Sequence, residues 1–171
     1  MEYNLETIYE LLQENLLKPT STGQPLVDKV FMLTNGEVGK KEIIARYNDD
    51  IYSGEYVGFV QIAETPVDVS ASMTEVMIFV TVIIACRHEN PAPTALESLA
   101  FYNQTWKKAL RFIGNLVTAA EQVQQEPGND LKILLEKELI APVGRIANVN
   151  LSGCVFDLNI SFEGSKLLFD A

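Results

Sequence analysis

The side chains that could catalyse a reaction are few, and three of them stand together near the middle of the chain. His88 is the only histidine, and Cys86 and Glu89 lie beside it. Any Ser-His-Asp or Cys-His mechanism would have to use His88 as its base. The sequence offers no partner pair that would complete such a constellation. We therefore expect His88 to lie at the end of a strand, exposed or bonded to a backbone carbonyl, and we expect no catalytic residues.

A metal site is equally hard to build. A zinc site needs three or four ligands, whereas the chain holds two cysteines, Cys86 and Cys154, and one histidine. We expect both thiols to be buried in strands. Asp49, Asp50 and Glu55 could suggest a calcium loop, but the ligand spacing of an EF-hand is absent. A solvated turn is the better interpretation, so we expect no bound metal and no cofactor.

The sequence also gives little support for a phosphate-binding loop or for catalysis by a pair of carboxylates. The stretch 36–41 resembles a phosphate-binding loop, but its glycines are two residues too close and no Ser or Thr follows the lysine. A hairpin turn fits this stretch better. Acidic residues are plentiful but scattered over helix faces and turns, so no pair for acid-base work can be identified.

One basic cluster stands out in an acidic chain. It consists of Lys107, Lys108 and Arg111, which on a helix would point away from Trp106. The cluster is either the solvated face of that helix or a contact for an acidic partner. We expect Trp106 itself to be a core residue rather than a platform for a ligand.

Length and charge limit the possible partners. The 171 residues suffice for one domain, residues 1–171, with a real core. The net charge is −10, from 13 basic and 23 acidic residues. A negative field repels phosphate backbones and anionic lipid surfaces, so we expect neither nucleic acid nor membrane as a partner. Met1–Asn4 lack the basic start and apolar run of a signal peptide, so none is expected.

An apolar strand near residues 74–87 is the expected centre of the fold. Both alternating sets of its side chains are apolar, with Val76 and Ile78 in one set and Met77 and Phe79 in the other. A strand of this kind is covered on both faces and lies near the middle of a sheet. It is too short for a membrane-spanning helix, which needs about 20 residues.

Helical periodicity predicts two main helices against this sheet. The first spans residues 4–17, and the second, near 94–125, begins at a capping box of Thr94 and Glu97. An extra helical segment is expected at about 129–141. The apolar stripe of the first helix consists of Leu5, Ile8, Leu12 and Leu16, and that of the second of Leu96, Leu99, Trp106, Leu110, Ile113 and Val117.

Shorter apolar runs predict the remaining strands. Residues 29–34 and 41–47 flank an Asn-Gly turn signal and form either a hairpin or a longer loop. Residues 56–63 are expected to pair antiparallel with the central strand. Near the end of the chain the alternation changes parity at Gly153, which predicts a tight turn or a bulge between two strand segments. The predicted class is α+β with a mostly antiparallel sheet.

The element order and the end of the chain resemble those of tail-terminator and tail-completion proteins of long-tailed bacteriophages and prophages. The resemblance covers most of the chain: a helix, irregular strands, the strand Tyr56–Ile62, a long strand, a helix and paired strand segments at the end. It continues in the basic residue and alternating strand of Arg145–Leu151, the turn at Ser152–Gly153, and the strand Val155–Glu163 with its aliphatic and aromatic residues. Compared with the family, the stretch from about 122 to 142 is extra.

The resemblance implies a structural role. Such proteins form a closed ring, commonly hexameric, that caps the tail tube and joins it to the head. Their partners are copies of themselves and other tail or head–tail connector proteins, first in the bacterial cytoplasm and then in the virion. Sheet edges and outer helix faces would carry a heterologous contact in such a ring. The alternatives are an acidic adaptor module that binds a basic partner, and a small enzyme or ligand-binding protein that uses carboxylates.

Overall fold

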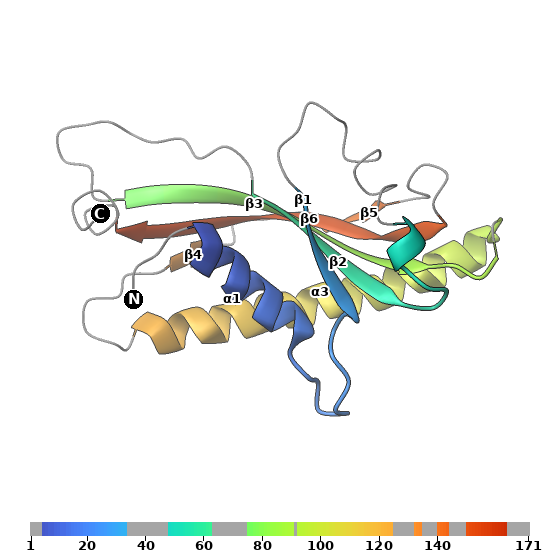
Figure 1. Ribbon diagram of the computed structural model, residues 1–171, viewed down its shortest axis with the longest axis horizontal. Coiled ribbons are helices and arrows are strands. Elements are labelled where there is room, and N and C mark those ends of the chain that lie inside the picture. The colour runs from blue at the N-terminus through green and yellow to red at the C-terminus, as the bar shows by residue number, and fades with distance from the viewer. Residues whose placement is uncertain are drawn as a thin grey trace.

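A mixed β-sheet with helices on one face makes up the part of the chain that the structure describes (Figure 1). The structure is a computed structural model, and it describes residues 5–33, 48–62, 75–90, 92–124, 132–134, 140–143 and 150–163. The elements are, in chain order, α1 (Leu5–Leu17), β1 (Lys29–Leu33), the 3₁₀ turn η1 (Asn48–Asp50), β2 (Tyr56–Ile62), β3 (Glu75–Arg87), α3 (Ala95–Gln124), β4 (Lys132–Leu134), β5 (Ala141–Val143) and β6 (Leu151–Glu163).

Strand β3 lies at the centre of the sheet, as the sequence predicted. The strand order is β1-β2-β3-β6-β4, and β5 pairs with another part of β6. β3 pairs antiparallel with β2 and, over its full 13 residues, with β6. β1 is parallel to β2. The sheet is therefore mixed but mostly antiparallel, and the predicted α+β class is confirmed.

The two faces of β3 are buried by two different clusters, which explains why both sets of its side chains are apolar. The cluster on the helix side joins Ile8, Leu12 and Leu16 of α1 and Ala109, Phe112 and Leu116 of α3 to Val60, Val80, Val82, Ile84, Phe156, Leu158 and Ile160 of the sheet. The cluster on the opposite face consists of Leu33, Ile51, Val57, Phe59, Ile83, Ala85 and Leu151. Each cluster removes apolar surface from water and so stabilises the central strands.

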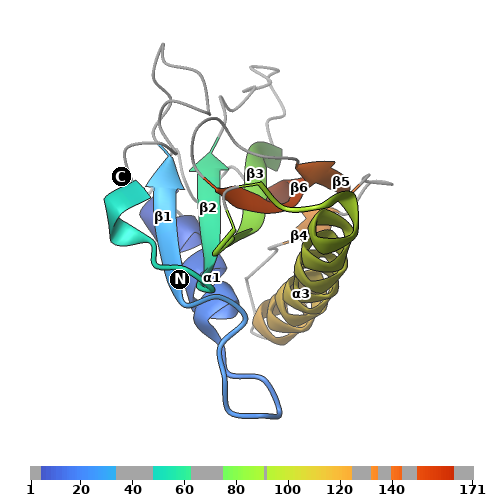
Figure 2. The same cartoon turned by 90° about the vertical axis from the view of Figure 1, so that its right-hand side faces the viewer.

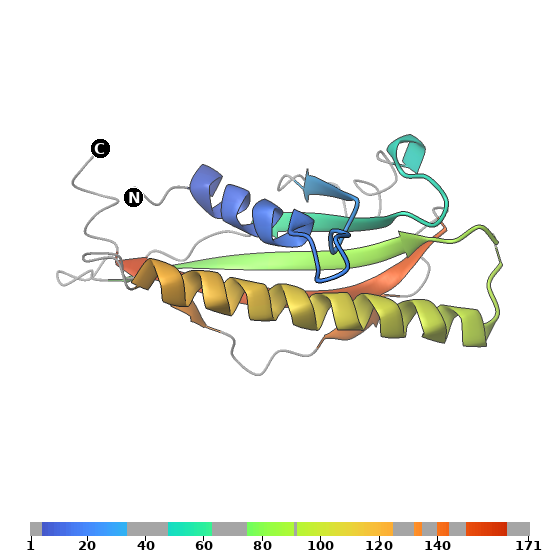
Figure 3. The same cartoon turned by 90° about the horizontal axis from the view of Figure 1, so that it is seen from below.

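The helices cover different halves of the same sheet face. α1 packs on β1 and β2, α3 packs on β3, β6 and β4, and the two helices also contact each other. Figures 2 and 3 show the two helices side by side along this face, with α1 beneath one edge of the sheet and α3 beneath the other. The buried apolar positions described on α1 are Ile8, Leu12 and Leu16, which belong to the predicted stripe, and Asn15 is buried as well. The molecule therefore presents two different helices to its surroundings.

The turn or bulge predicted at Gly153 is wrong, because β6 runs straight through this residue. Gly153 stays in register opposite Ala85 of β3. The change of parity has another cause: Leu151 packs in the cluster opposite the helices, whereas Phe156 and Leu158 pack on the helix side. A Cβ atom on Gly153 would lie 1.9 Å from the Ile84 carbonyl oxygen. The glycine is therefore required by a close backbone approach.

The helix predicted within 129–141 is also wrong where the structure describes that segment. Lys132–Leu134 is the strand β4, paired antiparallel with β6. A short leucine-rich run suits either state, and pairing with the outer edge of β6 decides it. Residues 135–139, the predicted strand 41–47 and the loop-like stretch 36–41 lie outside the described residues.

The start of α3 follows the prediction closely. The Glu97 carboxylate accepts a hydrogen bond of 2.7 Å from the Thr94 amide, and the Glu97 amide donates a 3.3 Å bond to the Thr94 hydroxyl. This reciprocal capping box satisfies amides that would otherwise lack partners in the first turn. The helix then continues for 30 residues, a length of about 45 Å.

Candidate functional site

The most distinctive surface feature is an apolar stripe on α3 that faces solvent. The exposed fractions are 82% for Leu96, 63% for Leu99, 45% for Leu110 and 38% for Trp106. The prediction that Trp106 is a core residue is therefore wrong. The helix packs instead through a second row, which consists of Thr105, Ala109, Phe112 and Leu116. We define the α3 stripe as Leu96, Leu99, Trp106 and Leu110.

The row of Thr105, Ala109, Phe112 and Leu116 faces the sheet because its two small residues, Thr105 and Ala109, allow the helix to approach closely. Thr105 and Ala109 are fully buried, and the Thr105 hydroxyl donates within the helix to the Phe101 and Tyr102 carbonyls. Phe112 then fills the space against Phe156 of β6, with ring centroids 6.0 Å apart. Trp106 and Leu110 lie about 100° around the helix from Thr105 and Ala109, and the bulkier stripe is left outside this contact.

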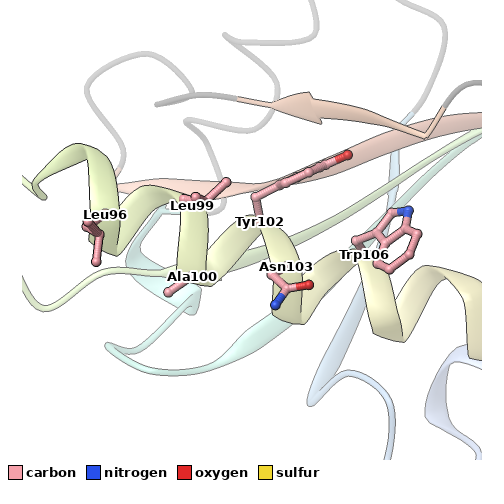
Figure 4. A pocket seen from close by; sticks show the side chains of 6 residues that line it. All are labelled: Leu96, Leu99, Ala100, Tyr102, Asn103 and Trp106. Atoms are coloured by element: carbon pink, nitrogen blue, oxygen red, sulfur yellow. The ribbon is translucent and has the colours of Figure 1, made fainter.

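Part of the stripe lines a shallow groove of about 640 Å³ (Figure 4). The lining residues are Leu96, Leu99, Ala100, Tyr102, Asn103 and Trp106. Figure 4 shows the rings of Tyr102 and Trp106 on one side of the helix. The Tyr102 hydroxyl donates a 3.1 Å bond to the Ile140 carbonyl, next to β5. The described lining is mostly apolar, with the Asn103 amide and the Tyr102 hydroxyl as its polar side-chain groups, so it suits an apolar contact.

The predicted basic cluster divides into two parts. Lys107 and Arg111 are exposed. Lys108 is half-buried, donates a 2.6 Å bond to the Leu26 carbonyl and lies 4.2 Å from the centre of the Tyr56 ring. Burial lowers the pKa of Lys108 below its ordinary value. Lys108 is therefore an internal link between α3 and the segment before β1, and of the three cations in the cluster only the other two face solvent.

His88 lies just beyond the end of β3, as predicted, but its side chain is buried rather than exposed. Only 3% of its surface is accessible, and the ring meets Phe101 edge-on with centroids 4.1 Å apart. Its backbone amide donates a 2.7 Å bond to the Asn150 carbonyl. A small cavity of about 300 Å³ next to His88 is lined by Gly54, Arg87, Glu89, Asn90, Pro93, Glu97 and Phe101.

The thiol nearest to His88 in sequence is not activated. Burial raises the pKa of Cys86 to about 11, and burial raises that of Cys154 to about 11 as well. A nucleophilic cysteine needs the opposite shift. Both cysteines are free and buried in strands, which confirms their predicted placement.

The acidic turn at 49–55 is held by an ion pair. The Lys29 ammonium lies 3.0 Å from the Glu55 carboxylate and donates a 2.6 Å bond to the Asp50 carbonyl. Partial burial alone would raise the pKa of Glu55, but the Tyr52 amide and Lys29 together lower it. Asp49 and Asp50 are exposed. Among the residues that the structure describes, no three His, Cys, Asp or Glu side chains are grouped to hold a metal ion.

The α3 stripe is the feature that sequence reasoning placed wrongly, although its residues were recognised as apolar. The missed signal was the second row at helical spacing, whose smaller residues can approach a sheet. Neither α1 nor α3 carries an apolar stretch long enough to cross a bilayer. No protein-family model matches this chain, and no curated protein matches it.

Proposed function

We propose that this protein is a non-enzymatic structural subunit that assembles with copies of itself into a closed ring. In this proposal it is a tail terminator or tail-completion protein of a phage or prophage, which caps the tail tube and joins it to the head. The observation that carries the proposal is the α3 stripe, with Leu96 and Leu99 largely exposed beside Trp106 and Leu110. Contiguous apolar surface of this kind marks protein contacts.

The composition of the stripe supports a protein contact over a ligand site. Tryptophan is enriched among the residues that dominate binding energy at interfaces, and leucines around it exclude water. The groove beside it is shallow and has few polar groups to orient a small ligand. The stripe therefore supports assembly better than catalysis.

The remaining parts of the proposal follow from the family resemblance. Tail-tube and head–tail connector proteins would be the further partners of the ring. The site of action would be the bacterial cytoplasm during assembly and the virion afterwards. The presence of two different helices on one sheet face supports a ring, because a closed ring joins two different patches of each subunit.

The test is the size and shape of the purified protein. We expect light scattering to give a mass well above that of one chain as concentration rises, and electron micrographs to show rings. The variant L96S/L99S should remain monomeric and folded, because both side chains are exposed. Met32→Ser on β1 is the matched control, since Met32 is an exposed apolar residue outside the stripe. A wild-type protein that stays monomeric at every concentration would contradict the proposal.

An adaptor that binds a basic partner is the second candidate function. One observation favours it: Glu6, Glu10 and Glu14 are all exposed on α1, and the chain carries a net charge of −10. An adaptor would stay monomeric alone and would lose its partner when these three residues become lysine. The same light-scattering measurement therefore separates the two functions.

A further inference from the structure

Helix α1 carries an uninterrupted acidic row on its solvent side. Glu6, Glu10 and Glu14 follow one another at intervals of four residues and are exposed. Ile8 and Leu12 are buried on the opposite side of the helix. Neighbouring members of the row are about 6 Å apart along the axis. We call these three residues the α1 row.

Helix α3 carries a basic row of the same spacing beside its apolar stripe. Lys107 and Arg111 are exposed and four residues apart, which again gives about 6 Å along the axis. Each basic residue directly follows a member of the stripe, Trp106 or Leu110, in the sequence. The α3 face therefore combines apolar contact area with two positive charges.

The two charged rows find no ion-pair partner in the described part of their own chain. The ion pair formed there joins Lys29 to Glu55, and neither row forms a hydrogen bond from its side chains to other described residues. α1 packs on β1, β2 and one side of α3, whereas α3 packs on β3, β6 and β4 (Figure 2). Lys108 and Tyr102 fix the rotation of α3 by bonding to the Leu26 and Ile140 carbonyls on either side of it.

We infer that the α1 row of one copy docks on the α3 face of the next copy, so that α1 covers the α3 stripe and its glutamates face Lys107 and Arg111. This inference rests on the proposed function and names the two patches that the ring joins. Charge complementarity selects this occupant, because two neighbouring glutamates of the α1 row have the same spacing as Lys107 and Arg111 and can pair with both. A head-to-tail contact of this kind repeats around a ring.

A contact between two α3 helices fits the structure less well. The stripe has the 3-4 spacing of a coiled-coil seam only from Leu96 to Leu110, because Ala120 is buried and Ile113 packs against the core. A stable coiled coil needs three or four heptads. Two copies of the α3 face would also bring their basic rows together, and like charges across an interface oppose association.

The charge pattern also predicts how assembly responds to salt. Copies with a net charge of −10 repel one another overall, so a local match of opposite sign must fix the register. These charges are exposed and are screened over about 8 Å at physiological ionic strength. Raising the salt concentration should therefore weaken the charge pairing that aligns α1 of one copy with α3 of the next. The apolar contact of the stripe should remain.

The experiment is a charge swap between the two rows. We expect K107E/R111E and E10K/E14K each to weaken self-association by roughly 100-fold, because each places like charges opposite one another. Mixing the two variants in equal amounts should restore assembly, since each then supplies the row that the other lacks. The quadruple variant should assemble alone. D49K/E89K has the same charge change as E10K/E14K at exposed positions elsewhere, and it should assemble like the wild type.

The outcomes separate this inference from the proposed function. If K107E/R111E fails to assemble while E10K/E14K assembles normally, the α3 face binds something other than the α1 row, and the inference is overturned while the ring survives. The inference also fails if the mixture and the quadruple variant both stay monomeric although each remains folded by circular dichroism. If the wild type never assembles, the proposed function fails first.

Discussion

Gly153 of β6 lies so close to Ile84 of β3 that a Cβ atom at position 153 would be 1.9 Å from the Ile84 carbonyl oxygen. Real Cβ atoms do not approach a backbone oxygen so closely, so any side chain would push apart the two central strands. The register Gly153 to Ala85 therefore depends on the absence of a side chain at one position. The glycine permits the close approach of β6 to β3, and the two apolar clusters stabilise these strands on both faces.

Replacing this glycine should destabilise the protein strongly. We expect Gly153→Ala to lower the free energy of unfolding by at least about 3 kcal/mol, because a clash with backbone cannot be relieved by a rotamer change. Urea unfolding followed by circular dichroism measures the loss. Gly114→Ala on α3 is the control, since nothing lies within 4 Å of its added Cβ. That change should raise stability by up to about 1 kcal/mol, and equal effects at both sites would refute a special role for Gly153.

Lys108 should matter for stability although it is a surface-type residue. Lys108→Met keeps most of the aliphatic stem but leaves the Leu26 carbonyl without its 2.6 Å donor. We expect a loss of about 1 to 2 kcal/mol in the free energy of unfolding. Lys18→Met, at an exposed lysine just after α1, should change stability by less than about 0.5 kcal/mol. A negligible loss at Lys108 would show that its bond to Leu26, in the segment before β1, does not stabilise the fold.

The two thiols should be chemically silent in the folded protein. Cys86 and Cys154 are buried, and burial raises the pKa of each to about 11. We expect neither to react with a thiol reagent near neutral pH until the protein unfolds, after which both react. Rapid labelling of either thiol in the folded protein would contradict its burial.

The same pKa shifts predict a loss of stability at alkaline pH. An unfolded cysteine loses its proton near pH 8.5, whereas the folded thiols keep theirs up to about pH 11. The unfolded state therefore releases more protons as the pH rises, and the free energy of unfolding falls between these limits. Below about pH 8.5 the thiols contribute no pH dependence. C86A/C154A should show a smaller decline over the same range, although it starts less stable because of the cavities it creates.

The sequence predicts the central strand well because its signal is local. Both alternating sets of β3 are apolar, and only a strand covered on both faces satisfies that pattern. The capping box of Thr94 and Glu97 is similarly local, because both of its hydrogen bonds form within one turn. Features of this kind depend on neighbouring residues and need no knowledge of distant contacts.

The rotation of α3 could not be read from periodicity alone. Two rows on this helix have helical spacing, and the more hydrophobic row, which contains Leu99 and Trp106, was the natural choice for the core. The structure buries Thr105 and Ala109 instead, because small residues let the helix approach the sheet. Lys132–Leu134 presents the same difficulty: its state is decided by pairing with a distant strand. The sequence therefore identifies the apolar residues of the candidate interface, but it does not show that the rotation of α3 turns them toward solvent.

Trp106 offers the most direct test of the central claim, because it is the only tryptophan in the chain. It is 38% exposed in one copy and lies on the α3 stripe. We expect its fluorescence emission to shift to shorter wavelength, and its quenching by acrylamide to fall, as concentration drives the mass measured by light scattering upward. L96S/L99S should show neither change. Assembly in which Trp106 keeps its emission and its full access to quencher would contradict the claim that copies of this protein meet on α3.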